Sequence, residues 1–412
     1  MRAIPLLHGH GVVLVLLLCC NVCAGFTPGS VTVLRIGDGS GAVTDSAQIV
    51  FLDEYDALTG GFIASHELPS TGSTALTLSG DGDHDGHLNL SSDGQYILLG
   101  GYRADAGAAN PVTQTPSAVN RVIGRVANDW SVDTSTALTD AYDRCDITAV
   151  ASDTGERFWT SGEGKYLDLT NGDPNYDWKV PTTTGGLRYV TGLGDSTSIN
   201  VSQTQTIPSD LEAGPWPDSI RNTRIIDGQL YITTPAWESF VNRGAYATTD
   251  PLPTSGPQTM IPVITNVEGQ QPDPKGKQVP KTDVILLDLE PTVPGLDTAY
   301  TTGGKDKYEK WSLVNDIWVM VSGEALPSGQ EINAFDAFVD GTDVMLFAST
   351  DQGVYSLVDT AGYNADFSDT FPMDPFIDAA SNTEFRGIVY VPEPTGLLLL
   401  GLSGVALLRR RR

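Results

Sequence analysis

The sequence is poor in positive charge. It has 24 Lys and Arg residues against 51 Asp and Glu residues, which gives a formal net charge of −27 over 412 residues. Such a negative field repels nucleic acid and anionic lipid, and it keeps an exported protein soluble. We therefore expect no nucleic-acid partner, whereas divalent cations and cationic polymers suit the charge.

Cysteine is scarce as well. Three of the four cysteines lie within the first 24 residues, so Cys145 is alone in the rest of the chain. One cysteine cannot form an internal disulfide, so no covalent bridge is expected. Because the apolar stretch Cys145–Val150 predicts a strand, we expect a buried and inert thiol.

Catalytic signatures are also missing. The sequence has no Gly-x-Ser-x-Gly motif, and only His66, His84 and His87 of its five histidines lie beyond the N-terminal segment. Gly-x-Gly strings such as Gly37–Gly39 lack a following helix, which argues against a phosphate-binding loop. Two carboxylates suffice for glycoside hydrolysis, but the sequence does not locate such a pair. These absences favour a non-enzymatic protein.

Helical periodicity is nearly absent between the two ends of the chain. Short runs alternate apolar and polar residues instead, as in Val31–Ile36, Ala75–Leu78, His87–Leu90 and Arg224–Ile232. This period of two is typical of half-buried β-strands. No charged linker or low-complexity break divides the intervening sequence of about 365 residues. We therefore expect one all-β domain, residues 25–390.

A strand–turn–strand unit recurs in this domain. It appears at Ser91–Gly101, Ala151–Gly162, Asp227–Tyr231 and Val339–Leu346. An Asp-Gly pair supplies the positive φ that a tight hairpin needs. The gap of about 61 residues between Gly94 and Gly155 suits blades of four strands with variable outer loops.

Such units, with no helices to cover a sheet, favour radial repetition. The segment Leu90–Tyr96 resembles the repeat of lactonase-like β-propellers. We predict a single β-propeller of about seven four-stranded blades, with six or eight as alternatives. The strand Phe385–Val391 is expected to close the ring against Val31–Ile36. A pair of β-sandwiches and a right-handed β-helix are the competing architectures.

Residues 1–24 have the features of a signal peptide. Arg2 gives a positive start, and Gly11–Leu18 is an apolar run too short to span a bilayer. Val22 and Ala24 place small residues at positions −3 and −1 of a cleavage site. We therefore expect a signal helix that signal peptidase removes after Ala24. Lipidation of a leader cysteine is the alternative.

The last 22 residues, 391–412, carry the most specific pattern. A Pro-Glu-Pro motif at 392–394 precedes an apolar run at 395–408 and an arginine block at 409–412. A helix of about 14 residues is only ~21 Å long, which is short of the ~30 Å hydrocarbon core. We therefore predict a weak transmembrane helix at 395–408, with the arginines on the cytoplasmic side.

This arrangement resembles the PEP-CTERM sorting segment of exported bacterial proteins. The resemblance implies recognition by an exosortase, a membrane protease, and cleavage near the Pro-Glu-Pro motif. The implied sorting residues are Val391, Pro392, Glu393, Pro394, Arg409, Arg410, Arg411 and Arg412. An ordinary C-terminal anchor that is never cut is the alternative.

An acidic loop is the best candidate for a metal site. Its candidate ligands are Asp81, Asp83, Asp85 and Asn89. The spacing matches the front of an EF-hand-like calcium loop, with Gly86 at the sharp bend. Ser92 stands where a bidentate acid belongs, however, and strands flank the loop. Three interpretations stay open: a solvated acidic hairpin, a weak calcium site, and a softer metal bound by His84 and His87.

Two loops place aromatic rings beside carboxylates. Trp178 follows Asp177, and Trp216 lies two residues before Asp218. A ring face with nearby carboxylates suits the stacking and hydrogen bonding of a sugar. The alternative is that both rings pack over blade edges.

These features describe an exported propeller that is transiently anchored in the membrane and then reaches the cell surface or extracellular matrix. Exosortase systems accompany exopolysaccharide production, so the resemblance implies a polysaccharide as a possible partner. We predict a non-enzymatic binding or structural role. A secreted propeller enzyme of lactonase, glycosidase or lyase type and a calcium-stiffened adhesin are the alternatives.

Overall fold

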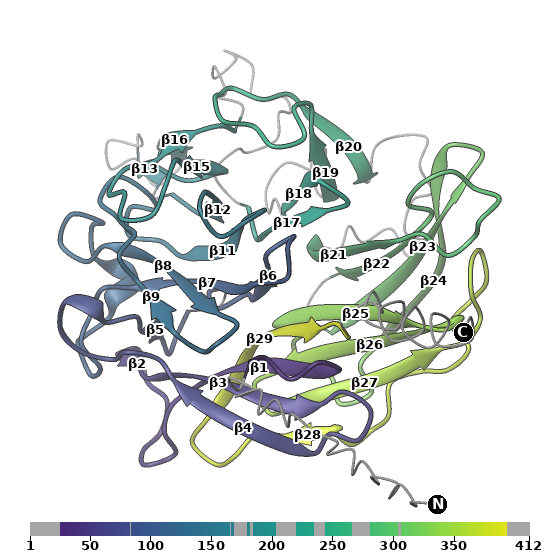
Figure 1. The fold of residues 1–412 in the computed structure, drawn as a ribbon, viewed down its shortest axis with the longest axis horizontal. Helices are drawn as coiled ribbons and strands as arrows, with labels where there is room; N and C mark the ends of the chain where they lie inside the picture. The colour runs from purple at the N-terminus through teal and green to yellow at the C-terminus, as the bar shows by residue number, and fades with distance from the viewer. Residues whose placement is uncertain are drawn as a thin grey trace, which may run out of the picture.

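The described part of the chain is a β-propeller of six blades around a central axis (Figure 1). The computed structural model describes residues 25–393 except 83, 165, 169–178, 182–183, 203–219, 235–243, 266–280 and 304–305. The predicted signal helix at 1–24 and the predicted transmembrane helix at 395–408 lie outside these residues. Among the described residues, none forms a helix of the length and hydropathy that crossing a membrane requires.

Each blade is an antiparallel sheet whose strands follow one another from the innermost, at the axis, to the outermost. Blade 1 consists of β29 (Glu384–Val391), β1 (Ser30–Ile36), β3 (Val50–Asp56) and β4 (Phe62–Glu67). Blade 2 consists of β6 (Asn89–Leu90), β7 (Tyr96–Tyr102), β8 (Arg121–Ala127) and β10 (Ala137–Leu138), and β9 (Val132–Asp133) also pairs with β8. Blade 3 consists of β11 (Ile147–Ala151), β12 (Phe158–Gly162), β15 (Arg188–Val190) and β16 (Ile199–Asn200).

The second half of the ring repeats this arrangement. Blade 4 consists of β17 (Asn222–Ile226), β18 (Gln229–Thr234), β19 (Gly244–Thr248) and β20 (Met260–Thr265). Blade 5 consists of β21 (Lys281–Leu287), β22 (Thr298–Gly303), β23 (Lys307–Val314) and β24 (Ile317–Ala325). Blade 6 consists of β25 (Ala334–Asp340), β26 (Asp343–Thr350), β27 (Gly353–Asp359) and β28 (Ile377–Asp378).

Among the described residues, four short strands and two turns of 3-10 helix lie outside the blades. The strands form two pairs, β2 (Ala47–Gln48) with β5 (Leu78–Ser79) and β13 (Tyr166–Asp168) with β14 (Lys179–Pro181). The 3-10 turns are η1 (Gly72–Thr74) and η2 (Pro111–Thr113).

The recurring unit of the sequence marks one blade each time it appears. Gly94, Gly155, Gly228 and Gly341 lie in the turn between the innermost and second strands of blades 2, 3, 4 and 6. Their φ angles, +66° to +75°, are the left-handed values that favour glycine. In blade 5 a longer loop replaces this turn, and in blade 1 the innermost strand is the last strand of the chain. The predicted hairpins are therefore confirmed.

The prediction of about seven blades is wrong, because the ring has six. Long outer connections lengthen the blades; residues 360–376, for example, separate β27 from β28. The spacing of about 61 residues between Gly94 and Gly155 is the length of one whole blade. A body of about 365 residues is filled by six blades of that length.

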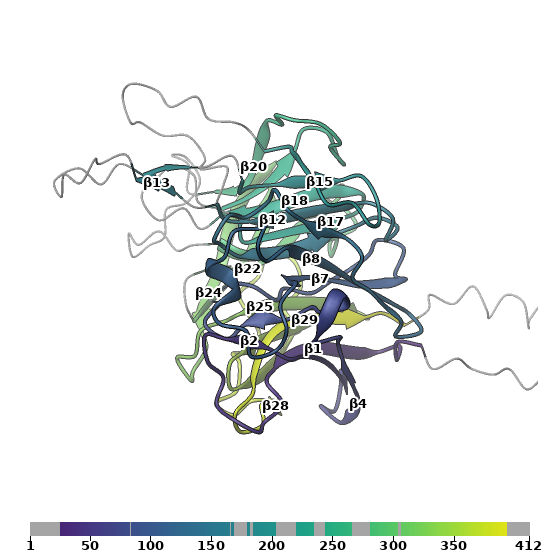
Figure 2. The same ribbon diagram turned by 90° about the vertical axis from the view of Figure 1, so that its left-hand side faces the viewer.

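The ring closes as the sequence predicts. β29 pairs antiparallel with β1, in a register that joins Val31 to Tyr390 and Ile36 to Glu384, and the two strands lie side by side in both views (Figures 1 and 2). This pairing joins the two ends of the described chain within one sheet. Cys145 is a free thiol, so hydrogen bonds and packing hold the closure.

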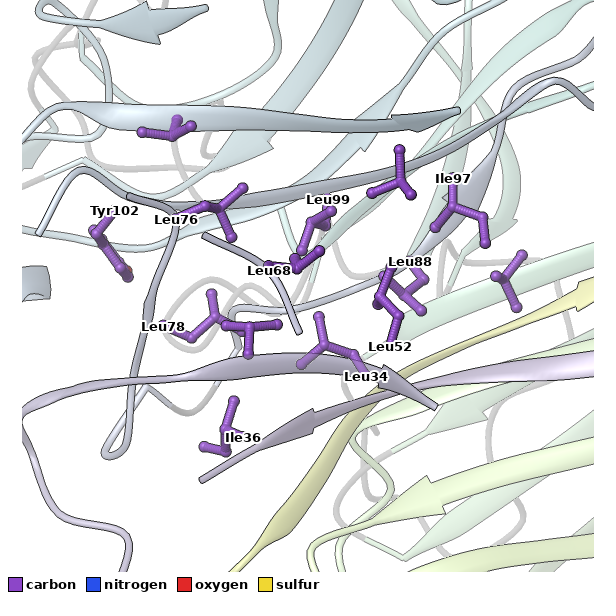
Figure 3. Close-up of a cluster of buried hydrophobic side chains, with 14 of the residues drawn as sticks. Leu34, Ile36, Leu52, Leu68, Leu76, Leu78, Leu88, Ile97, Leu99 and Tyr102 are labelled. Carbon is purple, nitrogen blue, oxygen red and sulfur yellow. The ribbon is translucent and has the colours of Figure 1, made fainter. Parts of the chain in front are cut away.

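In the described part of the chain, six clusters of buried apolar side chains lie between neighbouring blades, one at each interface. Figure 3 shows the cluster between blades 1 and 2, where Leu34 and Leu52 meet Leu88, Ile97 and Leu99. Successive residues of a strand point to opposite sides of the blade, so Val33 packs toward blade 6 and Leu34 packs toward blade 2. Full burial of one such side chain contributes about 1.5–3 kcal/mol, so the interfaces hold the ring together.

Cys145 is half-buried and lies just before β11 rather than in the strand. Burial raises the pKa of its thiol to about 12. The thiol therefore stays protonated at neutral pH, which agrees with the predicted inert role.

Candidate functional site

The innermost strands of the six blades surround the central axis, and neighbouring members contact one another around the ring. Buried or largely buried polar side chains occur on these strands or directly before them: Asp85, His87, Asn89, Thr148, Asn222, Arg224, Asp283, Asp336 and Arg386. Buried charges are stable only when they are paired and hydrogen-bonded. The centre of the ring, which we call the channel, is therefore occupied by a network of polar contacts, and its two ends differ.

Arg224 is the centre of the network at one end. Its Nε lies 3.1 Å from Asp283 Oδ1, and its Nη1 lies 2.9 Å from Asp336 Oδ1. Its Nη2 donates to the backbone oxygen of Phe335 at 2.8 Å. Burial raises the pKa of Asp283 and of Asp336, and the Arg224 guanidinium opposes both shifts. One cation thus joins blades 4, 5 and 6.

Both carboxylates receive further hydrogen bonds. Asn222 Nδ2 donates to Asp283 Oδ1 at 2.8 Å, and the Phe335 N–H donates to Asp283 Oδ2 at 3.1 Å. The Tyr390 N–H donates to Asp336 Oδ2 at 2.7 Å. Because Tyr390 belongs to β29, the closing strand takes part in the same network.

A hollow of about 240 Å³ lies over this network. Its lining residues come from four of the innermost strands and from the residue after β29: Asn89, Leu90, Arg224, Ile225, Ile226, Asp336, Ala337, Val389, Tyr390 and Pro392. Most of them stand near the end of their strand, where the turn glycines of the repeat follow. The hollow therefore lies at the mouth of the channel beside which the chain leaves the fold.

A second polar group lies toward the other end of the channel. Asp85 accepts the Ser79 N–H on Oδ2 at 3.2 Å, whereas its buried Oδ1 has no hydrogen-bond partner among the described residues. Asp146 accepts the Tyr102 hydroxyl at 3.0 Å. Burial and the nearby Asp146 raise the pKa of Asp85 to about 7. Burial and Glu163 raise the pKa of Asp146 to about 6.

Arg386 connects this group to the closing strand. Its guanidinium donates to the backbone oxygens of Gly80 (3.1 Å) and Gly82, and it pairs with Glu384 at 2.9 Å. The positive charge of Arg386 also acts to lower the pKa of Asp85, against the effect of burial. Arg386 therefore holds the loop before β6 against β29.

His87 lies between the two groups as a buried neutral imidazole. Its Nδ1 is 3.9 Å from Asp283 Oδ2 and has no hydrogen-bond partner among the described residues. Burial, with Arg224 and Arg221, lowers its pKa to about 3. A histidine with this pKa is a poor general base at neutral pH.

The predicted metal ligands that the structure describes lie in different surroundings. Asp81 is exposed and accepts the Ser79 hydroxyl at 2.6 Å, whereas Asp85 is buried in the channel. The Asn89 amide nitrogen donates to the backbone oxygens of Val150 and Thr223 at 2.9 and 3.0 Å. Asp83 lies outside the described residues. Within the described ranges, no three His, Cys, Asp or Glu side chains form a group that could hold a metal ion.

The other predicted site residues fall largely beyond the described parts. Trp178 and Trp216 lie outside them, as do Pro394 and the arginines 409–412. Val391 is the last residue of β29 and pairs with Ser30. Pro392 and Glu393 follow directly after the strand.

Sequence reasoning missed Arg224, Asp283 and Asp336 as a group. They come from three blades, so no local pattern connects them. One signal was available, because Asn89, Arg224 and Asp336 each precede the turn glycine of their blade by four or five positions. A polar residue at that position of a repeat marks the wall of the channel.

No protein-family model and no curated protein matches the chain. Solved structures with a similar fold include dihydro-heme d1 dehydrogenase NirN in complex with DHE, at 10% identity over 82% of this chain and 53% of that one, with a TM-score of 0.37. The β-propeller domain of Cps50 (Swd1) from Myceliophteria thermophila is 9% identical over 85% of this chain and 88% of that one, with a TM-score of 0.38. AztD from Citrobacter koseri is 11% identical over 84% and 83%, with a TM-score of 0.34. The chain spans about half the length of NirN, and at such identities the likeness concerns the β-propeller fold alone.

Proposed function

We propose that this chain is an exported protein whose tail delivers it to the cell surface or extracellular matrix. There the propeller acts as a non-enzymatic binding or structural component. The observation that carries the proposal is the tail itself, in which a Pro-Glu-Pro motif, a short apolar run and four arginines follow one another. The motif follows the last paired residue, Val391, so a protease could reach it without opening the ring.

The start of the fold supports export in the same way. Phe26 is buried, and its N–H donates to Asn128 Oδ1 at 2.7 Å. The body therefore begins to pack two residues after the expected cleavage site at Ala24.

A binding role agrees with the state of the channel acids. Asp283 and Asp336 are engaged by Arg224, so neither is free to act as a nucleophile or base. The nearby imidazole of His87 has a pKa lowered to about 3 by burial. A mouth whose polar groups are held in place by one another is suited to recognition rather than to proton transfer.

A secreted propeller enzyme remains the second candidate because of Asp85 and Asp146. Their raised pKa values, about 7 and about 6, are those of an acid–base pair. This pair lies toward the far end of the channel from the hollow. Loss of lactone or glycoside hydrolysis in both Asp85→Asn and Asp146→Asn, with wild-type activity present, would favour the enzyme.

The delivery proposal is tested by mass spectrometry of the exported protein in its host. We expect a chain that begins at Gly25 and ends near the Pro-Glu-Pro motif, without the arginine block. A matched variant, Pro392→Ala with Pro394→Ala, keeps the apolar run and the arginines, and it should remain uncut in the membrane. Recovery of an intact C-terminus from released wild-type protein, or unchanged localisation after deletion of residues 394–412, would refute the proposal.

A further inference from the structure

We propose that the hollow beside Tyr390 binds one neutral sugar unit of a polysaccharide. The assignment of a polysaccharide as the source rests on the proposed function, whereas the chemistry of the ligand comes from the hollow itself. Pro392, the first residue of the Pro-Glu-Pro motif, lines the hollow, but the contacts described below do not involve it.

The size of the hollow limits the ligand to a small one. About 240 Å³ corresponds to about eight water molecules at ~30 Å³ each. Pockets for drug-sized ligands begin at about 300 Å³, so an extended oligosaccharide does not fit inside. A single ring at the end or branch of a chain fits this volume, with the rest of the polymer outside.

The polar wall presents donors and acceptors side by side. Arg224 Nη1 carries two hydrogens. One of them is donated to Asp336 Oδ1, and among the described residues the second has no acceptor. Asp336 accepts one hydrogen bond on each oxygen, which leaves a lone pair on each. The Asn89 amide nitrogen is used by two backbone oxygens, so its amide oxygen remains an acceptor.

Such a wall matches adjacent hydroxyl groups. A hydroxyl donates one hydrogen bond and accepts others, so two neighbouring hydroxyls can donate to Asp336 and accept from Arg224 at the same time. Hydrogen bonds to charged partners are the stronger ones. A ligand without hydroxyls would leave the second hydrogen of Arg224 Nη1 and the remaining lone pairs of Asp336 without partners, and this penalty supplies the selectivity.

Charge disfavours an ionic ligand. The Arg224 cation is already shared between Asp283 and Asp336, so the floor of the hollow carries a small negative excess. The whole protein is strongly acidic, with a formal net charge of −27. A uronate or sulfated sugar would be repelled, and a cationic sugar would have to compete with Arg224 for Asp336.

Tyr390 supplies a rigid apolar side to the hollow. Its ring is stacked on Phe338, with centroids 3.7 Å apart and planes within 6° of each other. Its backbone N–H is bonded to Asp336 at 2.7 Å. Because the ring and the backbone of Tyr390 are both held in place, the residue loses little conformational entropy when a sugar ring packs against it.

The test uses the exported protein and the methyl glycosides of glucose, galactose and mannose, with glucuronic acid and glucosamine as charged counterparts. Binding is measured by saturation-transfer NMR and titration calorimetry at pH 7. We expect at least one neutral glycoside to bind, and Tyr390→Ala to weaken it by roughly tenfold. Phe338→Ala is the matched control, since it breaks the same stack without removing a side chain that lines the hollow, and it should weaken binding by less than about threefold.

Asp336→Asn tests the polar wall, because it keeps the shape and exchanges one acceptor for a donor. If it proves too unstable, Tyr390→Ala decides alone, since that variant removes no charge. Absence of neutral sugar binding, tighter binding of a charged counterpart, or equal affinity in Tyr390→Ala and wild type would overturn the inference. Correct sorting without sugar binding would refute this site alone, and sugar binding without sorting would refute only the delivery proposal.

Discussion

Replacement of Asp85 gives a sharp test of the electrostatics in the channel. An aspartate in the unfolded chain titrates near pH ~3.9, whereas burial and Asp146 raise the pKa of Asp85 to about 7 in the folded protein. Between these values the folded state holds a proton that the unfolded state has lost, so stability falls as the pH rises. Integrated from pH 5 to pH 8, this difference amounts to about 2–3 kcal/mol of unfolding free energy.

The variant Asp85→Asn removes this titration and keeps an oxygen for the Ser79 N–H. Its stability relative to wild type should therefore improve by about 2–3 kcal/mol from pH 5 to pH 8. Urea unfolding followed by tryptophan fluorescence at four pH values measures this difference. Burial lowers the pKa of His87 to about 3, so this residue increasingly stabilises the folded state as the pH rises toward ~6.5. The contribution is common to both proteins and cancels in the difference.

Asp81→Asn serves as the control, because Asp81 belongs to the same loop but is exposed. Its replacement should change stability by less than about 0.5 kcal/mol at every pH. A constant difference between Asp85→Asn and wild type, or one that shifts in favour of wild type as the pH rises, would refute the reasoning.

Three further perturbations test other parts of the molecule. Arg224→Met leaves two buried carboxylates without their shared cation and should lower the unfolding free energy by about 3–5 kcal/mol in the same urea titration. Arg144→Met removes a charge at the surface and should cost less than about 0.5 kcal/mol. Gly155→Ala places a Cβ 2.4 Å from the Tyr96 ring at φ +74°, whereas Gly228→Ala places one at φ +75° with no atom within 4 Å. Gly155→Ala should therefore lower the melting temperature clearly more than Gly228→Ala does, and equal melting temperatures would contradict this. Chelation with EDTA should leave the melting temperature unchanged, and a fall of several degrees would instead favour the calcium-stiffened adhesin.

Much of the architecture could be predicted from local sequence. Alternation of apolar and polar residues indicates strands because successive side chains of a strand point to opposite faces of the sheet. The turn glycines at 94, 155, 228 and 341 could be recognised because each lies between two short apolar runs, where a tight hairpin favours positive φ. The closing pair of β29 and β1 follows from the same alternation at the two ends of the body.

The number of blades was harder to predict because it depends on connections rather than on strands. Two blades lack the short glycine turn. In blade 5 a longer loop follows Leu287, and in blade 1 the innermost strand β29 is the last strand of the chain, so no turn connects it to β1. Counting turns alone therefore undercounts blades, while a standard blade length overcounts them. The observed spacing between Gly94 and Gly155 was the better measure, since it includes the outer loops.

The candidate site could be predicted only in part, since its members meet through the ring. Arg224, Asp283 and Asp336 belong to three successive blades, and their attraction appears only when the inner strands converge on the axis. Asn89 was identified as a possible calcium ligand from its spacing in an acidic loop. Its amide nitrogen donates to the backbones of two neighbouring blades, and the residue also lines the hollow.

The closing strand β29 joins three properties of the molecule that the sequence presents separately. It completes the ring by pairing with β1, it contributes Tyr390 and Val389 to the hollow, and it ends at the residue before the Pro-Glu-Pro motif. Because the innermost strand is also the last one, Pro392 of the motif lies beside the mouth of the channel. Cleavage at the motif leaves all the pairs of β29 intact, whereas a cut two residues earlier would remove Tyr390 from Asp336 and from the hollow. The position of the motif relative to this strand is therefore what would allow release and binding to coexist in one chain.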